Sequence, residues 1–357
     1  MTARLKRRRR HAPGTSPGTY DSAAVRAAPP PVVVIVDYDA TSLVTITDEA
    51  RPRGPSTLAN RWIHVQGEPS LALLEHLRAE YDLDALALED VVSVHQRPKF
   101  NAHDSWRFLT LSLPNSASDV GFDELCVFSR DELLITFFSG DASVFDPIRK
   151  RLERSQHHMR RSNAAYLMYA LLDLAIDLLF PYLETFGERI EALEAEVLDR
   201  ARRETLAAVH DVRNRLLTAR RMVWATREVV SDVMRSLDKE EQSDRQLAPF
   251  LQDCYEHVVG AVDLIETYRE MATSLVEVYL SVVSNRLNDA MRVLTVIATL
   301  FIPPTFVVGI YGMNFDPEAG PLSMPELSWP YGYLIVMGII GVMMVSMFFF
   351  FRRKRWI

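Results

Sequence analysis

The chain has 357 residues, of which 48% are apolar and 24% are charged, and its formal net charge at pH 7 is −7. A chain of this length and composition can bury a sizeable core, which excludes disorder along its whole length and allows two or three structural units. The averages suggest a soluble protein, but they hide two long uncharged segments near the C-terminus.

Residues 1–31 combine a basic cluster, RLKRRRRH at residues 4–11, with a segment rich in Pro, Gly and Ser. The cluster could contact anionic lipid or nucleic acid. The neighbouring composition favours a disordered cytosolic tail, so we expect no nucleic-acid partner. An Arg-rich organellar transit peptide is a second interpretation. No apolar stretch typical of an export signal precedes residue 32, and the following domain is therefore expected in the cytosol.

Short apolar runs separated by turn residues occupy 32–38, 107–113, 124–130 and 132–138. They are typical of strands, and stretches between them, such as residues 70–81, have helical spacing. The pattern predicts an α/β domain over residues 32–162. Cys126 in this domain and Cys254 beyond it offer no metal-binding spacing and are expected to be buried small hydrophobic residues.

Residues 163–246 and 247–312 contain few Gly and Pro and are rich in Leu, Ala, Glu and Arg, which predicts long helices. We expect helices over 164–199 and 203–241, and a third from residue 248 without a break into an apolar segment. In the third helix apolar residues recur at steps of four and three, as in a helix packed along others: Leu251, Tyr255, Val258, Val262 and Ile265. A helix on the order of 100 Å long requires partners.

Residues 293–310 and 331–351 carry no charge, and each segment is long enough to cross a hydrocarbon core of about 30 Å. The loop between them, residues 313–330, has no Lys or Arg, whereas the tail at residues 352–357 begins RRKRW. The positive-inside rule therefore predicts an external loop and two cytoplasmic termini. We predict an α+β membrane protein with an N-terminal cytosolic α/β domain, long helices forming a stalk or funnel, and two C-terminal transmembrane helices.

Two spans cannot enclose a pore, so transport would require several copies of the chain, and a soluble domain merely anchored to the membrane is the alternative. One helical face at the first span carries no charge: Asn288, Met291, Thr295, Ala298, Ile302, Thr305, Gly309 and Gly312. This face would suit a conduit for a hydrated ion, and its small residues would equally suit close helix packing. Pro303 and Pro304 remove two backbone donors and should bend or loosen the helix.

The sequence YGMNF at residues 311–315 ends the first span. Gly312 permits a tight backbone, and Asn314 offers a neutral amide, although Asn is also a common helix-ending residue. Repeated around an axis, Asn314 would form a ring of oxygens that hydrogen-bond the water shell of Mg²⁺, an ion that gives up water reluctantly. A carboxylate ring would hold the ion too firmly to conduct it.

YGMNF, followed by MPEL at 324–327, Trp329 and YGY at 331–333, resembles the CorA family of magnesium transporters, in which Gly-Met-Asn is the signature. The resemblance continues in LEDVVSVHQRPK at 88–99, VFDPIRKRL at 144–152 and YLSVVSNRLNDAMRVLTVIATLFIPPTF at 279–306. It implies a homopentamer in the cell (inner) membrane, with a funnel-shaped cytosolic domain. The first span of each subunit would line the pore and the second would face the lipid bilayer.

The resemblance assigns Gly312, Met313 and Asn314 to the external selectivity motif. The pore-lining positions that it implies are Asn288, Met291, Leu294, Thr295, Ile302, Thr305 and Gly309. Ile302 stands where relatives often have Met, and IPP replaces a more usual single Pro. The resemblance therefore does not assign the residues of a hydrophobic gate. In the external loop, Glu318 and Glu326 are expected to raise the local cation concentration.

The resemblance also implies that Asp90 of one subunit and Asp253 of the next bind regulatory Mg²⁺. We expect Glu89 and Glu256 to contribute around the ion, and His257 either to contribute or, as we favour, to be only a packed or hydrogen-bonded neighbour. Facing carboxylates repel without the metal, and a bridging cation would close the funnel when internal Mg²⁺ is high. By composition alone these acids are solvated charges or local caps. The acidic residues of 164–199, which include Asp173 and Asp177, either form a solvated face of the helix or hold cations near the funnel.

The expected cargo is Mg²⁺, with Co²⁺ and Ni²⁺ as further divalent cations. A Zn²⁺ transporter of the same architecture and a membrane-anchored Mg²⁺ sensor that does not conduct are the alternatives. A pore mouth without Cys or His favours a hard, hydrated ion over Zn²⁺. No nucleotide loop, catalytic triad or clustered His/Asp metal spacing is visible, so no enzymatic activity is expected.

Overall fold

The computed structural model describes residues 30–47, 52, 56, 58–93, 96–102, 106–115, 121–154, 158–237, 244–313, 316, 320, 324, 327 and 329–356. The chain divides into two compact units. The first comprises Met1–Ala195 and Glu204–Ser274, and the second comprises Glu196–Arg203 and Leu275–Ile357. Helix α8 (Ala248–Tyr311) contributes residues to both.

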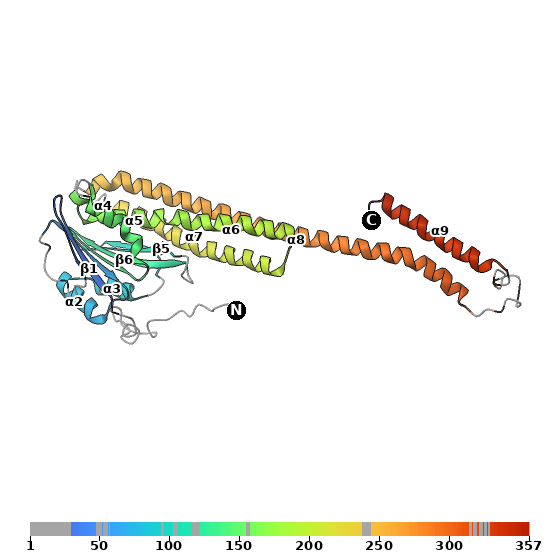
Figure 1. Cartoon of the computed structure of the whole chain (residues 1–357). Coiled ribbons are helices and arrows are strands. Elements are labelled where there is room, and N and C mark those ends of the chain that lie inside the picture. The colour runs from blue at the N-terminus through green and yellow to red at the C-terminus, as the bar shows by residue number, and fades with distance from the viewer. Residues whose placement is uncertain are drawn as a thin grey trace. The chain divides into compact units, whose positions relative to one another are not determined.

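A mixed β-sheet forms the centre of the first unit (Figure 1). Its strands are β1 (Val32–Tyr38), β2 (Leu43–Thr47), β3 (Asn60–Gln66), β4 (Lys99–Ala102), β5 (Arg107–Pro114), β6 (Phe122–Arg130) and β7 (Leu133–Phe138). The spatial order is β2-β1-β3-β7-β6-β5-β4, with β3 and β7 parallel and the other neighbours antiparallel. The predicted α/β domain is confirmed, and the four predicted strands correspond to β1, β5, β6 and β7.

Helices cover both faces of the sheet. On one face, α2 (Leu71–Tyr81) and α3 (Ala85–Val92) share a buried core with β1, β3, β6 and β7. Each begins at a capping side chain, because Ser70 accepts from the Leu73 amide and Asp84 from the Leu86 and Ala87 amides. Helix α5 (Ala164–Asp177) packs against β3, β5, β6 and β7. Alternate residues of β6, Leu125 and Val127, are also fully buried, as a strand covered on two sides requires.

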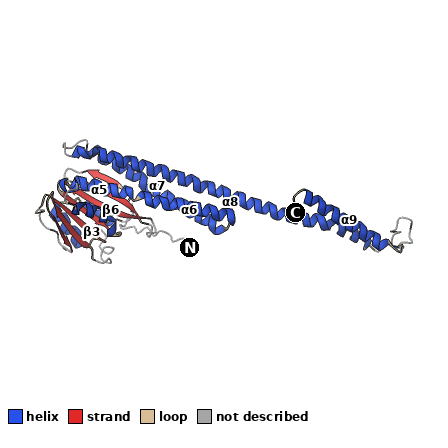
Figure 2. Cartoon of the chain, turned by 45° about the horizontal axis from the view of Figure 1, so that its top comes forward, coloured by secondary structure: helices blue, strands red, loops and turns tan. Residues whose placement is uncertain are grey.

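Shorter elements complete the first unit. They are α4 (Asp146–Glu153) and the 3₁₀ helices η1 (Ala142–Phe145), η2 (His158–Arg161) and η3 (Asp244–Leu247). The long helices α6 (Leu179–Asp199) and α7 (Arg203–Leu237) lie beside α8 in both Figure 1 and Figure 2. Gly187 of α6 lies under Tyr268 of α8: an added Cβ would be 2.7 Å from the tyrosine hydroxyl, so only glycine permits this close approach.

The buried stripe of α8 differs slightly from the predicted one. Leu251, Val258, Val262 and Ile265 are buried as predicted, and the stripe also includes Cys254 and Ala261, both fully buried. Tyr255 is only half-buried. The small side chains allow α8 to approach its neighbours closely, and the larger Tyr255 lies at the margin of the contact.

The predicted helix over 164–199 is divided between α5 and α6 at Leu178. Pro181 lacks a backbone N–H and cannot donate to the carbonyl of Asp177, which explains a break at this point. By length and composition this helical segment, α8 and α9 (Gly332–Arg353) could each cross a membrane. However, 56% of the apolar part of α5–α6 is buried within the protein, against 11% for α8 and α9. The apolar character of α5 is therefore explained by its packing on the sheet.

In the second unit α9 runs back beside the last part of α8 (Figures 1 and 2). Val296 and Pro304 of α8 and Ile340 of α9 are buried in this unit. Helix α8 continues through Pro303 and Pro304 to Tyr311. The turn between α6 and α7 also belongs to this unit, where Arg286 of α8 donates a 2.7 Å hydrogen bond from Nη2 to the carbonyl oxygen of Asp199.

Polar side chains of β3 are buried and paired. Arg61 donates from Nε and Nη2 to the two carboxylate oxygens of Asp37, each at 2.7 Å, and both residues are at least 90% buried. His64 contacts the Thr136 hydroxyl at 2.8 Å and Gln66 Oε1 at 3.0 Å. Burial lowers the pKa of His64 to about 4, so this imidazole is neutral at pH 7.

Replacement of Asp37 by Ala is expected to destabilise the first unit by about 3–5 kcal/mol, because it leaves the buried Arg61 guanidinium without its counterion. The measurement is urea denaturation of the detergent-solubilised protein followed by tryptophan fluorescence. The double variant Asp37→Leu/Arg61→Met removes both charges and should be less destabilised than Asp37→Ala. Equal stability of Asp37→Ala and the parent would contradict this account.

Candidate functional site

One face of α8 in the second unit is left uncovered by the rest of the chain. Met291, Leu294 and Ile302 are 54%, 60% and 64% exposed, and Asn288, Thr295, Thr305 and Gly309 are exposed as well. At 3.6 residues per turn these positions share one side of the helix. The opposite side is also largely exposed, at Val293, Ile297 and Val308, and between residues 280 and 311 only Val296 and Pro304 are buried. The predicted pore-lining residues are therefore brought together on one uncovered face.

The hydroxyl groups on this face are turned toward their own helix. Thr295 donates to the Met291 carbonyl at 2.7 Å, and Thr305 donates to the Phe301 carbonyl at 2.8 Å. Each hydroxyl still has lone pairs that can accept a hydrogen bond from water. The face thus offers neutral acceptors, methyl groups and apolar side chains, and it carries no charge that would hold a cation firmly.

The end of α8 closes with a tightened turn. The Gly312 amide donates to the Val308 carbonyl at 2.9 Å, and the Met313 amide donates to the Ile310 carbonyl at 3.1 Å. A Cβ added at Gly312 would lie 3.3 Å from the Val308 carbonyl oxygen, so a larger residue would crowd this turn. Met313 is half exposed. Asn314, Glu318 and Glu326 lie outside the described residues.

Helix α9 has the composition of a membrane span with marked ends. Its 22 residues extend over about 33 Å, which matches a hydrocarbon core. Trp329, Tyr331 and Tyr333 are exposed at its beginning. At its end come Arg352 to Arg355, followed by Trp356 stacked on Phe351. Aromatic residues at both ends and basic residues at one are typical of a spanning helix with a cytoplasmic C-terminus.

The two carboxylates of the predicted regulatory pair have different surroundings. Asp90 lies on α3 beside the half-buried Glu89, and its Oδ2 is 2.5 Å from Lys99 Nζ. Asp253 lies on α8, has a side chain that is 63% exposed, and is 3.9 Å from His257 Nδ1. Glu256 accepts from Gln252 at 3.0 Å. In the part of the chain that the structure describes, no three His, Cys, Asp or Glu side chains are grouped closely enough to hold a metal ion.

Asp173 of α5 and Cys254 of α8 make a contact that sequence reasoning missed. The Cys254 thiol lies 3.6 Å from Asp173 Oδ1. Burial raises the pKa of Asp173, and the nearby Asp177 and Asp253 carboxylates raise it further. The acidic run in α5 was visible in the sequence, but its proximity to Asp253 depends on the packing of α5 against α8.

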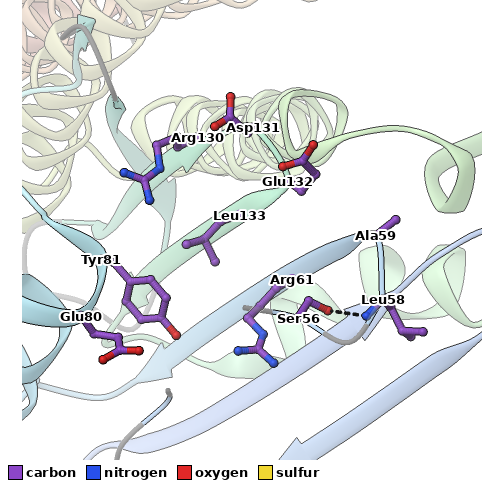
Figure 3. A pocket seen from close by; sticks show the side chains of 10 residues that line it. All are labelled: Ser56, Leu58, Ala59, Arg61, Glu80, Tyr81, Arg130, Asp131, Glu132 and Leu133. Carbon is purple, nitrogen blue, oxygen red and sulfur yellow. Dashed lines mark hydrogen bonds between the residues drawn. The ribbon is translucent and has the colours of Figure 1, made fainter. Parts of the chain in front are cut away.

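A cavity of about 430 Å³ lies elsewhere in the first unit (Figure 3). Its lining includes Tyr81 and Arg61, which point toward one another, and Asp131 and Glu132, whose carboxylates point away from them. Arg61 is already paired with Asp37. Because the charged groups do not converge on one point, this cavity is a weaker candidate than the uncovered face of α8.

Comparison with known proteins gives a family match over most of the chain. Residues 58–353 match the family model described as CorA-like Mg²⁺ transporter protein. The cobalt/magnesium transport protein CorA of Thermotoga maritima is 33% identical over 322 residues, which are 89% of this chain and 87% of that protein.

Solved structures share the fold. The complete CorA magnesium transporter from Methanocaldococcus jannaschii has a TM-score of 0.76 at 23% identity, over 91% of this chain and 98% of that one. The cytoplasmic domain of ZntB from Vibrio parahaemolyticus has a TM-score of 0.58 at 15% identity, over 73% of this chain and 100% of that one.

Asp173→Asn is expected to stabilise the protein at pH 7 in a chelator by about 0.5 kcal/mol, because it removes one of several crowded negative charges. A carboxyl whose pKa is raised on folding makes the folded protein less stable as the pH rises through that pKa. The gain should therefore disappear below pH 3.8, the ordinary value, where the carboxyl is protonated in both states. Urea denaturation at pH 7 and at low pH tests this, with the exposed Asp263→Asn as control. A gain that persists at low pH would contradict the electrostatic explanation.

Proposed function

The chain belongs to the CorA family, and on that premise we propose that it mediates Mg²⁺ influx across the cell membrane as a homopentamer. The observation that carries the proposal is the uncharged, uncovered face of α8. One chain buries only Val296 and Pro304 between residues 280 and 311 of this helix, so a pathway lined by Asn288, Thr295 and Thr305 requires further copies around an axis. Five copies of α8 would then line the pore, and five copies of α9 would face lipid.

Mg²⁺ is the proposed cargo because the pathway is neutral and rich in oxygen. A Mg²⁺ ion gives up its bound water reluctantly, and carbonyl, amide and hydroxyl groups can form hydrogen bonds to that water without removing it. Gly312, Met313 and Asn314 would form the external entrance, with Asn314 supplying a ring of amide oxygens. Glu318 and Glu326 would raise the local cation concentration outside it. Co²⁺ and Ni²⁺ are proposed as further cargo, since they also form hydrated divalent ions, whereas Zn²⁺ would favour Cys and His ligands.

The proposed orientation places both termini in the cytoplasm. The basic residues that follow α9 support it, as do the aromatic residues at both ends of that helix. In this orientation the sheet and the long helices of the first unit lie on the cytoplasmic side. The external loop then follows the Gly-Met-Asn sequence directly, where an ion would enter.

Regulation by cytosolic Mg²⁺ is proposed at Asp90 and Asp253 of adjacent subunits. Two carboxylates could serve as ligands of a hard cation: Asp90, once it is released from Lys99, and Asp253, which lies in a group of carboxylates that raises the pKa of Asp173. A divalent ion held by oxygens would offset that crowding and join two subunits. Binding that favours the closed state closes the pore when cytosolic Mg²⁺ is high.

A membrane-anchored sensor that binds Mg²⁺ without conducting would have the same regulatory carboxylates but no need of a neutral pathway. Flux separates the two functions. We expect the purified protein in liposomes to admit Mg²⁺, detected with an enclosed Mg²⁺-sensitive dye. Absence of flux at low internal Mg²⁺ would favour the sensor.

Asn314→Ala should lower Mg²⁺ uptake in such liposomes more than tenfold, because it deletes the amide that hydrogen-bonds the water shell of the ion. Assembly, followed by size-exclusion chromatography, should be unchanged. Val342→Ala removes a similar volume from the exposed surface of α9 and should leave uptake at the parental rate. Parental uptake by a correctly assembled Asn314→Ala protein would refute the proposed entrance.

Asp253→Ala and Asp253→Lys should both weaken the protection that Mg²⁺ gives the cytosolic domain against proteolysis. The first removes a ligand, and the second replaces metal charge with fixed charge, so protection no longer depends on bound Mg²⁺. Resistance to chymotrypsin against Mg²⁺ concentration is the measurement, and Asp263→Ala, on the same helix, is the control. Superimposable curves for the parent and both Asp253 variants would show that this carboxylate is only surface charge.

A further inference from the structure

The carboxylate of Asp90, the proposed regulatory ligand, is already paired with the lysine ammonium of Lys99 in the same chain. Asp90 lies near the end of α3, and Lys99 begins β4. Lys99 Nζ is 2.5 Å from Asp90 Oδ2, and the two side chains are 33% and 19% exposed, respectively. A pair this far removed from solvent is screened less by water and salt than a surface pair.

The place of this pair in the fold makes it available to a second molecule. Strand β4 lies at the end of the sheet and pairs with β5 on one side, with Lys99 opposite Thr110. Asp90 and Lys99 are therefore at the border of the domain. A carboxylate from another subunit could approach here without passing through the core.

An ammonium and a metal ion compete for the same carboxylate. A contact at 2.5 Å neutralises Asp90, and a positive charge so close to Oδ2 opposes the entry of a second cation. Lysine holds this place reversibly, because its charge is compact and its stem of four carbons is flexible. The exposed fraction of Lys99 gives the ammonium solvent into which it can withdraw. The Asp253 carboxylate, by contrast, is 63% exposed and lies 3.9 Å from the imidazole of His257, so the two halves of the proposed site do not have equal access to a metal.

We propose that Lys99 is an internal competitor that sets the cytosolic Mg²⁺ concentration at which Asp90 binds the regulatory ion. The inference rests on the proposed regulatory role of Asp90. In the absence of Mg²⁺, the ammonium of Lys99 neutralises the Asp90 carboxylate. When the Mg²⁺ concentration rises, the metal displaces the ammonium and binds both Asp90 and the Asp253 carboxylate of the adjacent subunit. Lys99 thereby shifts the response to higher Mg²⁺ concentrations than the two carboxylates alone would give.

The experiment compares the full-length parent with Lys99→Met, which keeps most of the apolar stem and removes the charge. Chymotrypsin resistance is measured against Mg²⁺ concentration at constant ionic strength, because this protease does not cleave after Lys or Arg. Half-maximal protection should move to about fivefold lower Mg²⁺, the factor expected for loss of one partly exposed ion pair. Lys99→Arg, which keeps the charge, should stay within twofold of the parent.

Arg97→Met is the matched control. Arg97 lies two residues from Lys99 but pairs with Glu228 at 3.0 Å, and both of those side chains are largely exposed. The Arg97→Met substitution removes one positive charge from the same region and leaves the Asp90–Lys99 pair unchanged. An equal shift for Arg97→Met and Lys99→Met would overturn the proposal in favour of a general effect of net charge. In an Asp90→Asn background, Lys99→Met should cause no shift.

The outcomes separate this inference from the function on which it rests. If the parent shows no Mg²⁺-dependent protection, the proposed regulation fails. If the parent is protected and Lys99→Met has the parental midpoint or a higher one, Lys99 is not a competitor and this inference fails alone. Thermal unfolding in chelator shows whether Lys99→Met is folded. If it is not, Lys99→Gln, which can still donate a hydrogen bond to Asp90, replaces it, and half-maximal protection should again move to lower Mg²⁺ concentration.

Discussion

The exposure of α8 is the constraint on which the second unit depends. A helix in a bilayer satisfies its backbone hydrogen bonds internally, so its side chains decide what surrounds it. Between residues 280 and 311 its own chain buries only Val296 and Pro304, and the apolar side chains of Val293, Ile297 and Val308 are exposed. Apolar side chains left uncovered over a segment of this length are typical of a helix that is surrounded by lipid or by other helices.

In the first unit, negative charge is divided between paired and crowded carboxylates. Asp37 is buried only because Arg61 holds both of its oxygens, and Asp90 is partly buried beside Lys99. Asp173 and Asp253 instead lie near other acids, and the result is a raised pKa at Asp173. This division leaves Asp37 and Asp90 each paired with a cation of their own chain, whereas the charges of Asp173 and Asp253 are not offset in this way.

The strands that sequence reasoning found are those whose apolar residues form unbroken runs. Strand β3 was missed because Asn60, Arg61, His64 and Gln66 interrupt its pattern, and their partners Asp37 and Thr136 come from other strands. Strands β2 and β4 were missed because they are short edge strands with exposed side chains. The uncharged face of α8 could be predicted, because it depends only on helical periodicity. The Asp90–Lys99 pair could not, because it depends on how α3 and β4 fold together.

The hydrogen bond from Arg286 to the Asp199 carbonyl has a mechanical consequence. Asp199 ends α6, and its carbonyl is one of the groups that a helix cannot satisfy by itself at its C-terminus. A guanidinium that supplies the missing donor also meets the negative end of the helix dipole. Sliding or twisting α8 relative to this turn would break the bond at 2.7 Å. The bond therefore joins the end of α6 to α8 two residues before Asn288, and because it is exposed to solvent it can break and re-form at a cost of about 1 kcal/mol.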